Sequence, residues 1–86
     1  MKHFNLTIYI PENNKSVDVD ETTFSTYLQE YPYGYFIGDN SKKWIMENSS
    51  GYILVSGEIK HNGMIYENAV MFKDKSTAAT FKLVWL

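Results

Sequence analysis

This chain has no cysteine, no arginine and no long apolar run. Without cysteine it can form neither a disulfide nor a thiolate metal site, and it has no cysteine nucleophile. A small secreted domain usually contains several cysteines, so their absence favours an intracellular setting. No segment approaches the roughly 18 apolar residues of a membrane span, and the N-terminal stretch is too short and too alternating for a signal peptide. We therefore expect a cytoplasmic protein that does not contact a membrane.

The lack of arginine also bears on nucleic-acid binding. Arginine has the planar fork that phosphate and guanine recognition uses. Here the positive charge comes from eight scattered lysines, against ten acids, which gives a net charge of −2. A generic nucleic-acid binder usually has a basic surplus or a basic stripe. The composition therefore argues against this class.

What the chain does contain is aromatic bulk: seven Tyr, five Phe and two Trp in 86 residues. Each of these side chains buries a large area, so even a short chain can build a core. A second domain would fall below the size that supports its own core. We therefore expect one domain over residues 1–86.

Two elements are clear in the first part of the chain. Residues 4–10 alternate between apolar and polar, which is typical of a half-buried strand, and Pro11 ends it. Residues 11–18 are predicted as a loop. A helix follows Asp20, which is a suitable N-cap, and Pro32 ends it. Its apolar stripe has helical spacing and consists of Phe24, Tyr27, Leu28 and Tyr31.

Residues 33–48 are predicted as one or two strands, and residues 50–72 as a long hairpin. Asn62-Gly63 is the hairpin turn, because both positions of a type I′ turn need positive φ. A two-residue loop then sets the pairing: His61 with Met64, Ile59 with Tyr66, Gly57 with Asn68, Val55 with Val70, and Ile53 with Phe72.

The last segment is predicted as a short helix over residues 75–82, capped by Asp74 and followed by a brief extended tail. Phe81 and Trp85 would then close one side of the core. In total the pattern predicts an α+β fold: a two-layer sandwich of an antiparallel β-meander, with about four to five strands and two short helices on one face.

The stretch AVMFKDKSTAATFKLVW, residues 69–85, resembles the C-terminal ends of small accessory proteins of tailed bacteriophages. These often finish with an apolar strand, an acidic break, an alanine-bearing short helix and FKL followed by an aromatic residue. The resemblance implies a virus-encoded protein in the cytoplasm of a bacterial host cell. It also implies a role in host takeover or counter-defence, through binding and altering a host factor. The matching stretch contains no site, so it assigns no functional residue.

The ionisable residues predict no catalysis, metal or cofactor. Glu58 and Glu67 face each other in the predicted register, where like charges are destabilising. They could bind a cation or share a proton. We prefer a solvated face, because two carboxylates without a third ligand make a poor metal site. His3 and His61 have no partner marked by spacing, and no nucleotide-binding or hydrolase motif is present.

The tyrosine-rich stretch EYPYGYF has three interpretations. Its aromatic residues can be core, or the centre of a protein interface, where tyrosine is enriched. In the third, Tyr33 and Tyr35 stack bases of a single-stranded nucleic acid while Lys42 and Lys43 contact phosphates.

The sheet itself is the other candidate surface. In the predicted register Ile45, Leu54 and Met71 lie on the face opposite the main core. Two short helices cannot cover both faces, so an exposed apolar patch is expected there, and such patches mark partner sites. Pairing of edge strands into a homodimer would be another way to cover the sheet.

We therefore predict a non-catalytic binding protein that modulates a host protein, such as a defence, toxin or nucleic-acid-processing factor. The predicted surface combines Tyr33 and Tyr35 with the apolar sheet face, rimmed by Glu58 and Glu67. A mildly acidic binder suits a basic target. The alternative is a single-stranded nucleic-acid-binding module that uses tyrosine stacking.

Overall fold

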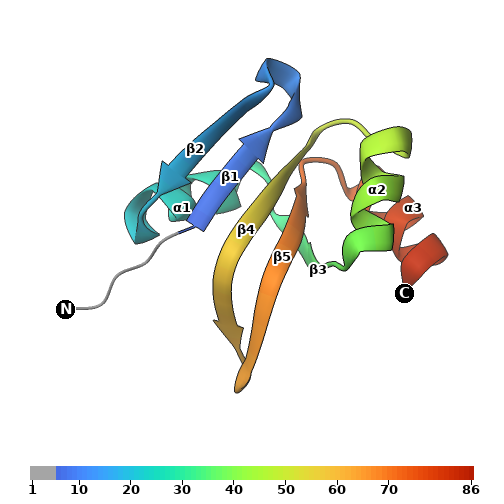
Figure 1. The fold of residues 1–86 in the computed structure, drawn as a ribbon. Coiled ribbons are helices and arrows are strands. Elements are labelled where there is room, and N and C mark those ends of the chain that lie inside the picture. The colour runs from blue at the N-terminus through green and yellow to red at the C-terminus, as the bar shows by residue number, and fades with distance from the viewer. Residues whose placement is uncertain (1–5) are drawn as a thin grey trace.

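The computed structural model describes residues 6–86, so His3 and Phe4 lie outside the described residues. It shows one antiparallel sheet in the order β2-β1-β4-β5-β3, with three α-helices (Figure 1). The strands are β1 (Leu6–Ile10), β2 (Lys15–Val19), β3 (Tyr33–Phe36), β4 (Tyr52–His61) and β5 (Met64–Phe72). The helices are α1 (Glu21–Glu30), α2 (Asp39–Asn48) and α3 (Lys75–Trp85), with a 3₁₀ turn at Pro11–Asn13. The predicted α+β class with an antiparallel sheet is confirmed.

The helix α1 forms for the reasons that its sequence indicates. The backbone N–H of Thr23 donates to the Asp20 carboxylate at 2.8 Å, so Asp20 is the N-cap. Val19 just before the cap and Phe24 inside the helix pack in the same core cluster, as in a hydrophobic staple. The helix ends at Glu30, before Tyr31 and Pro32.

Two elements differ from the prediction. Residues 15–19 form β2 and pair with β1 across a tight turn in which Asn14 has a φ of +49°. Residues 39–48 form helix α2 instead of a strand. Ser41 anchors its start, because the Gly38 N–H donates to the Ser41 hydroxyl oxygen at 3.0 Å and that hydroxyl donates back to the Gly38 carbonyl oxygen. Ile45 lies one turn later and is fully buried.

Helices cover both faces of the sheet. Phe24 and Tyr27 of α1 pack on one face, and Ile45 of α2 and Phe81 of α3 pack on the other. In β4 and β5 successive side chains alternate between the two clusters. The face under α1 receives Ile53, Val55, Ala69 and Met71. The opposite face receives Tyr52, Leu54, Val70 and Phe72.

The hairpin register is confirmed near the turn and wrong beyond it. Ile59 pairs with Tyr66 as predicted, but a β-bulge then shifts the register, and Ser56 instead of Gly57 pairs with Asn68. Leu54 therefore lies opposite Val70, where the prediction placed Val55. The bulge is at Gly57, whose φ of +130° is a conformation that glycine adopts readily.

The C-terminal helix is longer than predicted. It runs to Trp85, with Asp74 at the N-cap position, but the Asp74 carboxylate accepts no capping hydrogen bond from the backbone of the first turn. Phe81 is buried as predicted, whereas the Trp85 side chain is 39% exposed. Within residues 6–86, no helix has the length and apolar character needed to cross a membrane.

Candidate protein-binding surface

The outer half of the β4–β5 hairpin extends beyond the rest of the sheet. Strand β1 pairs with β4 only as far as Gly57, and β3 pairs with β5 only from Ala69 onwards. Among the described residues, Glu58–Glu67 therefore form a two-stranded ribbon, which Figure 1 shows projecting away from the helices. We call Glu58–Glu67 the hairpin tip. Two strands alone are marginally stable in water, so the tip also depends on the packing of Ile59 against the core cluster and of Tyr66 against Phe36.

One cluster of side chains on the tip is aromatic and continuous with β3. The rings of Phe36 and Tyr66 stack with centroids 3.8 Å apart and planes 8° from parallel. The His61 ring lies 5.5 Å from the Phe36 ring, and the Tyr66 hydroxyl lies 3.7 Å from the Met64 sulfur. We call Phe36, His61, Met64 and Tyr66 the tip patch.

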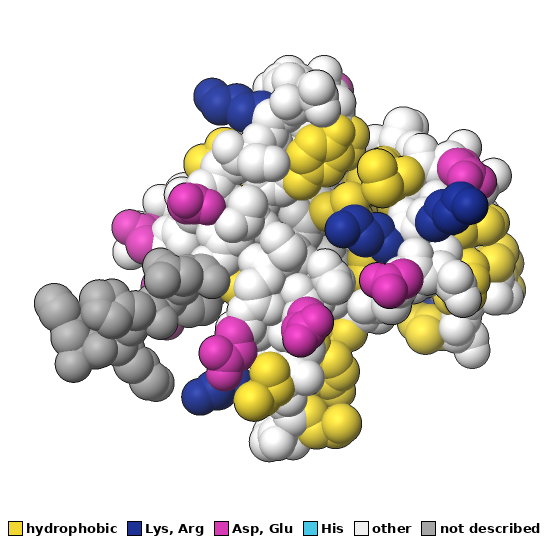
Figure 2. Space-filling view, in the orientation of Figure 1, with side chains coloured by type: hydrophobic (Ala, Val, Ile, Leu, Met, Phe, Trp, Pro, Cys, Tyr) yellow, Lys and Arg dark blue, Asp and Glu magenta, His cyan; other side chains and the backbone are white. Residues whose placement is uncertain are grey.

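The tip patch is accessible to a partner. Met64 is 59% exposed and Phe36 is 36% exposed, while Tyr66 is half-buried under its neighbours. Figure 2 shows apolar side chains gathered at this projecting end of the molecule and again over α2 and α3. Exposed apolar patches of this kind mark interaction sites, and methionine suits surfaces that adapt to a partner.

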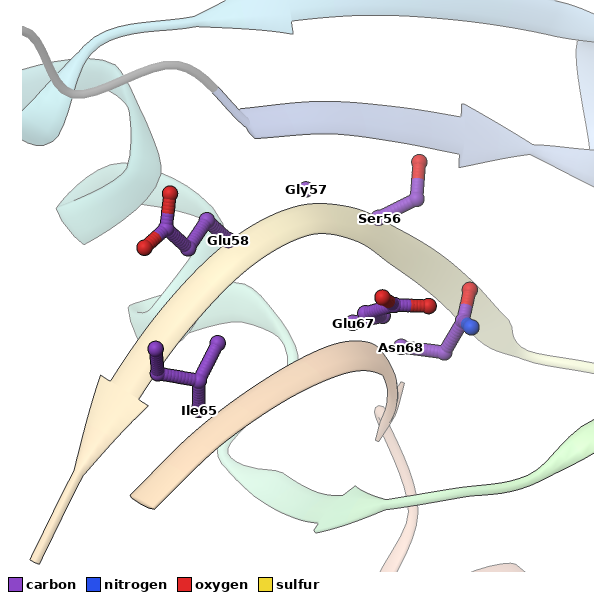
Figure 3. Close-up of a pocket in the computed structure, with 6 residues that line it drawn as sticks. All are labelled: Ser56, Gly57, Glu58, Ile65, Glu67 and Asn68. Atoms are coloured by element: carbon purple, nitrogen blue, oxygen red, sulfur yellow. The ribbon is translucent and has the colours of Figure 1, made fainter. Parts of the chain in front are cut away.

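Glu58 and Glu67 lie beside the bulge, with the exposed Ile65 between them and the turn. The bulge places both Gly57 and Glu58 opposite Glu67, so the predicted direct pairing of the two glutamates is wrong. They line a shallow hollow with Asn68, and Figure 3 shows their carboxylates pointing in different directions. Residues 6–86 contain no group of three or more His, Asp or Glu side chains placed to hold a metal ion.

Three residues predicted on the partner-binding face are core residues. Ile45 is fully buried, Leu54 is 5% exposed and Met71 is 3% exposed. The prediction failed because it gave the chain two helices on one face. With α2 and α3 on one side and α1 on the other, both faces of the inner sheet are covered.

Tyr33 and Tyr35 belong to strand β3, where both are half-buried. The Tyr35 ring lies 5.5 Å from the Phe81 ring and 6.3 Å from the Phe72 ring, so it packs against the core. Lys42 and Lys43 lie on α2, with Lys42 half-buried and Lys43 exposed. Tyr33 and Tyr35 both pack against the core cluster under α2 and α3, and the Tyr35 ring is engaged with other aromatic rings.

A second exposed apolar surface lies at the end of α3. Leu83 is 88% exposed and Leu86 is 73% exposed, with Val84 and Trp85 beside them. This surface was not predicted, because residues 83–86 were expected to form an extended tail. The spacing of Ala78 and Phe81, which are buried, could have placed Leu83 on the outward side of a continuous helix.

The residues whose pKa values are shifted have structural roles. The backbone N–H of Thr23 lowers the pKa of Asp20 by hydrogen bonding to its carboxylate. Burial raises the pKa of the Tyr31 and Tyr52 hydroxyls, and the charge of Glu30 adds to the effect at Tyr31. Asp20 caps a helix and both tyrosines are core residues, so none of the three points to a reactive site.

No protein-family model, no curated protein and no solved structure matches this chain. The phage resemblance of residues 69–85 stays a hypothesis.

Proposed function

We propose that this chain is a non-catalytic binding protein that holds a protein of a bacterial host through the tip patch. The observation that carries the proposal is the stacked Phe36–Tyr66 pair, in which Phe36 is exposed and Tyr66 half-buried, next to the exposed Met64 on the projecting hairpin. Aromatic residues dominate the energetically important centres of protein interfaces. A projecting ribbon can also enter a groove that the broad body of the molecule could not.

The charges on the hairpin tip favour a basic partner. Glu58 and Glu67 are exposed on the tip and outnumber its only lysine, Lys60. Complementary charge speeds encounter and disfavours acidic partners. The phage resemblance supports a target in the host, such as a defence, toxin or nucleic-acid-processing factor.

The test is capture from bacterial lysate by three forms of the protein, each with and without nuclease. The forms are the unmodified chain, a tip variant (Met64→Ser with Tyr66→Ser) and a control (Leu83→Ser with Leu86→Ser). The control also removes two exposed large apolar side chains, but at the end of α3. The protein captured is then purified and titrated against each form by calorimetry, after thermal melting has shown that each form is folded.

We expect the tip variant to bind about tenfold more weakly or worse, since interface-centre aromatics cost the most when removed. The control should bind as the unmodified chain does, and capture should survive nuclease. Unchanged affinity in the tip variant would contradict the proposal. Loss of capture on nuclease treatment would favour the single-stranded nucleic-acid alternative instead.

A further inference from the structure

Within residues 6–86, no strand pairs with the outer edge of β3, which is the last strand of the sheet. The Ile37 N–H donates to the Asn68 carbonyl oxygen at 3.1 Å, and the register pairs Tyr35 with Val70 and Tyr33 with Phe72. In an antiparallel ladder, the backbone groups of alternate residues point towards the same neighbour. Tyr33, Tyr35 and Ile37 therefore bond to β5. The N–H and C=O groups of Gly34 and Phe36 point away from the sheet.

The two edge strands of the sheet differ in protection. Strand β2, at one edge, has the exposed charged residues Lys15 and Asp18. Strand β3, at the other, has no charge, and its Gly34 is exposed. Edge charges are a common device against strand pairing. The β3 edge lacks this device, so it is the edge open to a further strand.

We propose that β3 pairs antiparallel with β3 of a second copy of this chain, which joins two sheets into one of ten strands. A second copy fits because the edge is complementary to itself in one register. If Gly34 of one copy lies opposite Phe36 of the other, the two free residues of each copy satisfy one another with four backbone hydrogen bonds.

Registers shifted to either side would form fewer backbone hydrogen bonds between the two copies. A shift in one direction would bring in Pro32, which has no N–H to donate. A shift in the other direction would bring in Gly38, whose N–H already donates to the Ser41 hydroxyl oxygen. The central register needs neither residue. It also places Phe36 directly across from Gly34 of the other copy, and aromatic residues across from an edge glycine stabilise such pairs.

The register predicts which residues of the two copies lie close together. Engineered cysteines can test this, because the chain has no cysteine of its own that could form other disulfides. Tyr35 lies opposite Tyr35 of the other copy in a non-hydrogen-bonded pair, with Cα atoms about 4.5 Å apart. That separation is within the range for a disulfide. The two Tyr33 residues are offset by four positions, which is roughly 13 Å along the strands and too far for a disulfide.

The first experiment is air oxidation of Tyr35→Cys and Tyr33→Cys, each read on a non-reducing gel. The two residues are matched, since both are half-buried tyrosines on the same strand. We expect Tyr35→Cys to form a covalent dimer and Tyr33→Cys to stay a monomer. No dimer from Tyr35→Cys, or equal dimer from both, would overturn the proposal.

The second experiment is sedimentation over a range of concentrations for the unmodified chain, Gly34→Pro and Gly34→Ala. Proline removes the outward N–H and blocks the edge, whereas alanine keeps the N–H. A Cβ at Gly34 would meet its nearest atom, the Met71 Cγ, at an ordinary 3.6 Å. We expect reversible dimers from the unmodified chain and from Gly34→Ala, with association at least about tenfold weaker for Gly34→Pro.

An unmodified chain that stays monomeric up to millimolar concentration would overturn the proposal, as would a Gly34→Pro form that is folded and dimerises normally. Should Gly34→Pro fail to fold, the cysteine experiment decides alone. Neither experiment changes Met64 or Tyr66, so dimerisation and partner capture can fail independently.

Discussion

The two halves of the β4–β5 hairpin are built from the same two strands and have opposite surroundings. The inner halves, Tyr52–Val55 and Ala69–Phe72, are buried at every position. The outer halves, in the hairpin tip, are exposed or half-buried at every position. The difference lies in the cover: the inner halves have a strand on each side and helices on both faces. Among the described residues, the outer halves pair only with each other, and they contact the body of the molecule through Ile59, which packs against the core cluster under α1, and through Phe36 of β3, which stacks on Tyr66.

This contrast shows which sequence pattern a strand has when both of its faces are buried. The inner sequences YILV and AVMF are unbroken apolar runs, as expected where helices cover both faces. The outer sequences EIKH and MIYE mix charge with apolar residues. The hairpin therefore changes from core to surface within one continuous element, and the bulge at Gly57 marks the boundary.

The largest expected effect is in the inner half. Phe72 is fully buried at the centre of the cluster under α2 and α3. Phe72→Ala should lower the free energy of unfolding by about 3–5 kcal/mol, because it removes apolar contacts and leaves a cavity. Urea denaturation followed by circular dichroism measures this. The matched change in the tip, Met64→Ala, should stay within about 0.5 kcal/mol. Similar losses of unfolding free energy at both positions would contradict the difference between the inner halves and the hairpin tip.

Tyr35 extends the comparison to β3, because its ring connects that strand to the core. Its ring packs on Phe72 and Phe81, so Tyr35→Ala should cost about 1–3 kcal/mol of unfolding free energy. Tyr35→Phe keeps the ring and should cost little. A Tyr35→Ala variant as stable as the unmodified chain, in the same denaturation experiment, would mean that this ring is free for a ligand.

The boundary between the two halves can be tested at Gly57. Its φ of +130° strains any residue with a Cβ, so Gly57→Ala should cost about 1–3 kcal/mol. Gly34→Ala in β3 is the control, since a Cβ there meets only ordinary contacts. Equal stability of the two variants by thermal melting would argue against the bulge.

The smallest effect concerns pH and belongs to the body of the molecule. The hydrogen bond from Thr23 lowers the pKa of Asp20 below its ordinary value of 3.8. The ionised carboxylate therefore stabilises the fold above that value, and the contribution is lost as the pH falls through the lowered pKa. Thermal melting between pH 7 and pH 2 should show this loss. Asp20→Asn keeps the cap without a titrating group, so its acid-induced loss should be smaller; an identical profile would rule out this role of Asp20.

The elements with local signals could be predicted from the sequence. Helix α1 has its cap, its stripe and its terminating proline close together, and Asn62-Gly63 defines a turn by backbone conformation alone. Both were predicted correctly, except that Leu28 of the predicted stripe is 43% exposed. The fold class followed from these elements and from the alternation of β1.

The missed features depend on contacts distant in sequence. Residues 39–48 have a weak apolar stripe, and Ile45 is the only large side chain of that helix that is buried. The helix is therefore positioned by packing against the cluster that contains Ile45. The bulge at Gly57 follows from how β4 pairs with two neighbours at once, which a hairpin turn does not encode. Missing these two features put Ile45, Leu54 and Met71 on the surface. The tip patch was missed because Phe36 and Tyr66 lie 30 positions apart in the sequence.

Amide hydrogen exchange of the free protein, followed by nuclear magnetic resonance, tests the central contrast most directly. We predict that the amides of Val70 and Phe72 exchange only through global unfolding. Amides in the hairpin tip should exchange through local openings of much lower free energy. Equal protection along the whole length of β4 and β5 would contradict it, because the tip would then be as firmly held as the core.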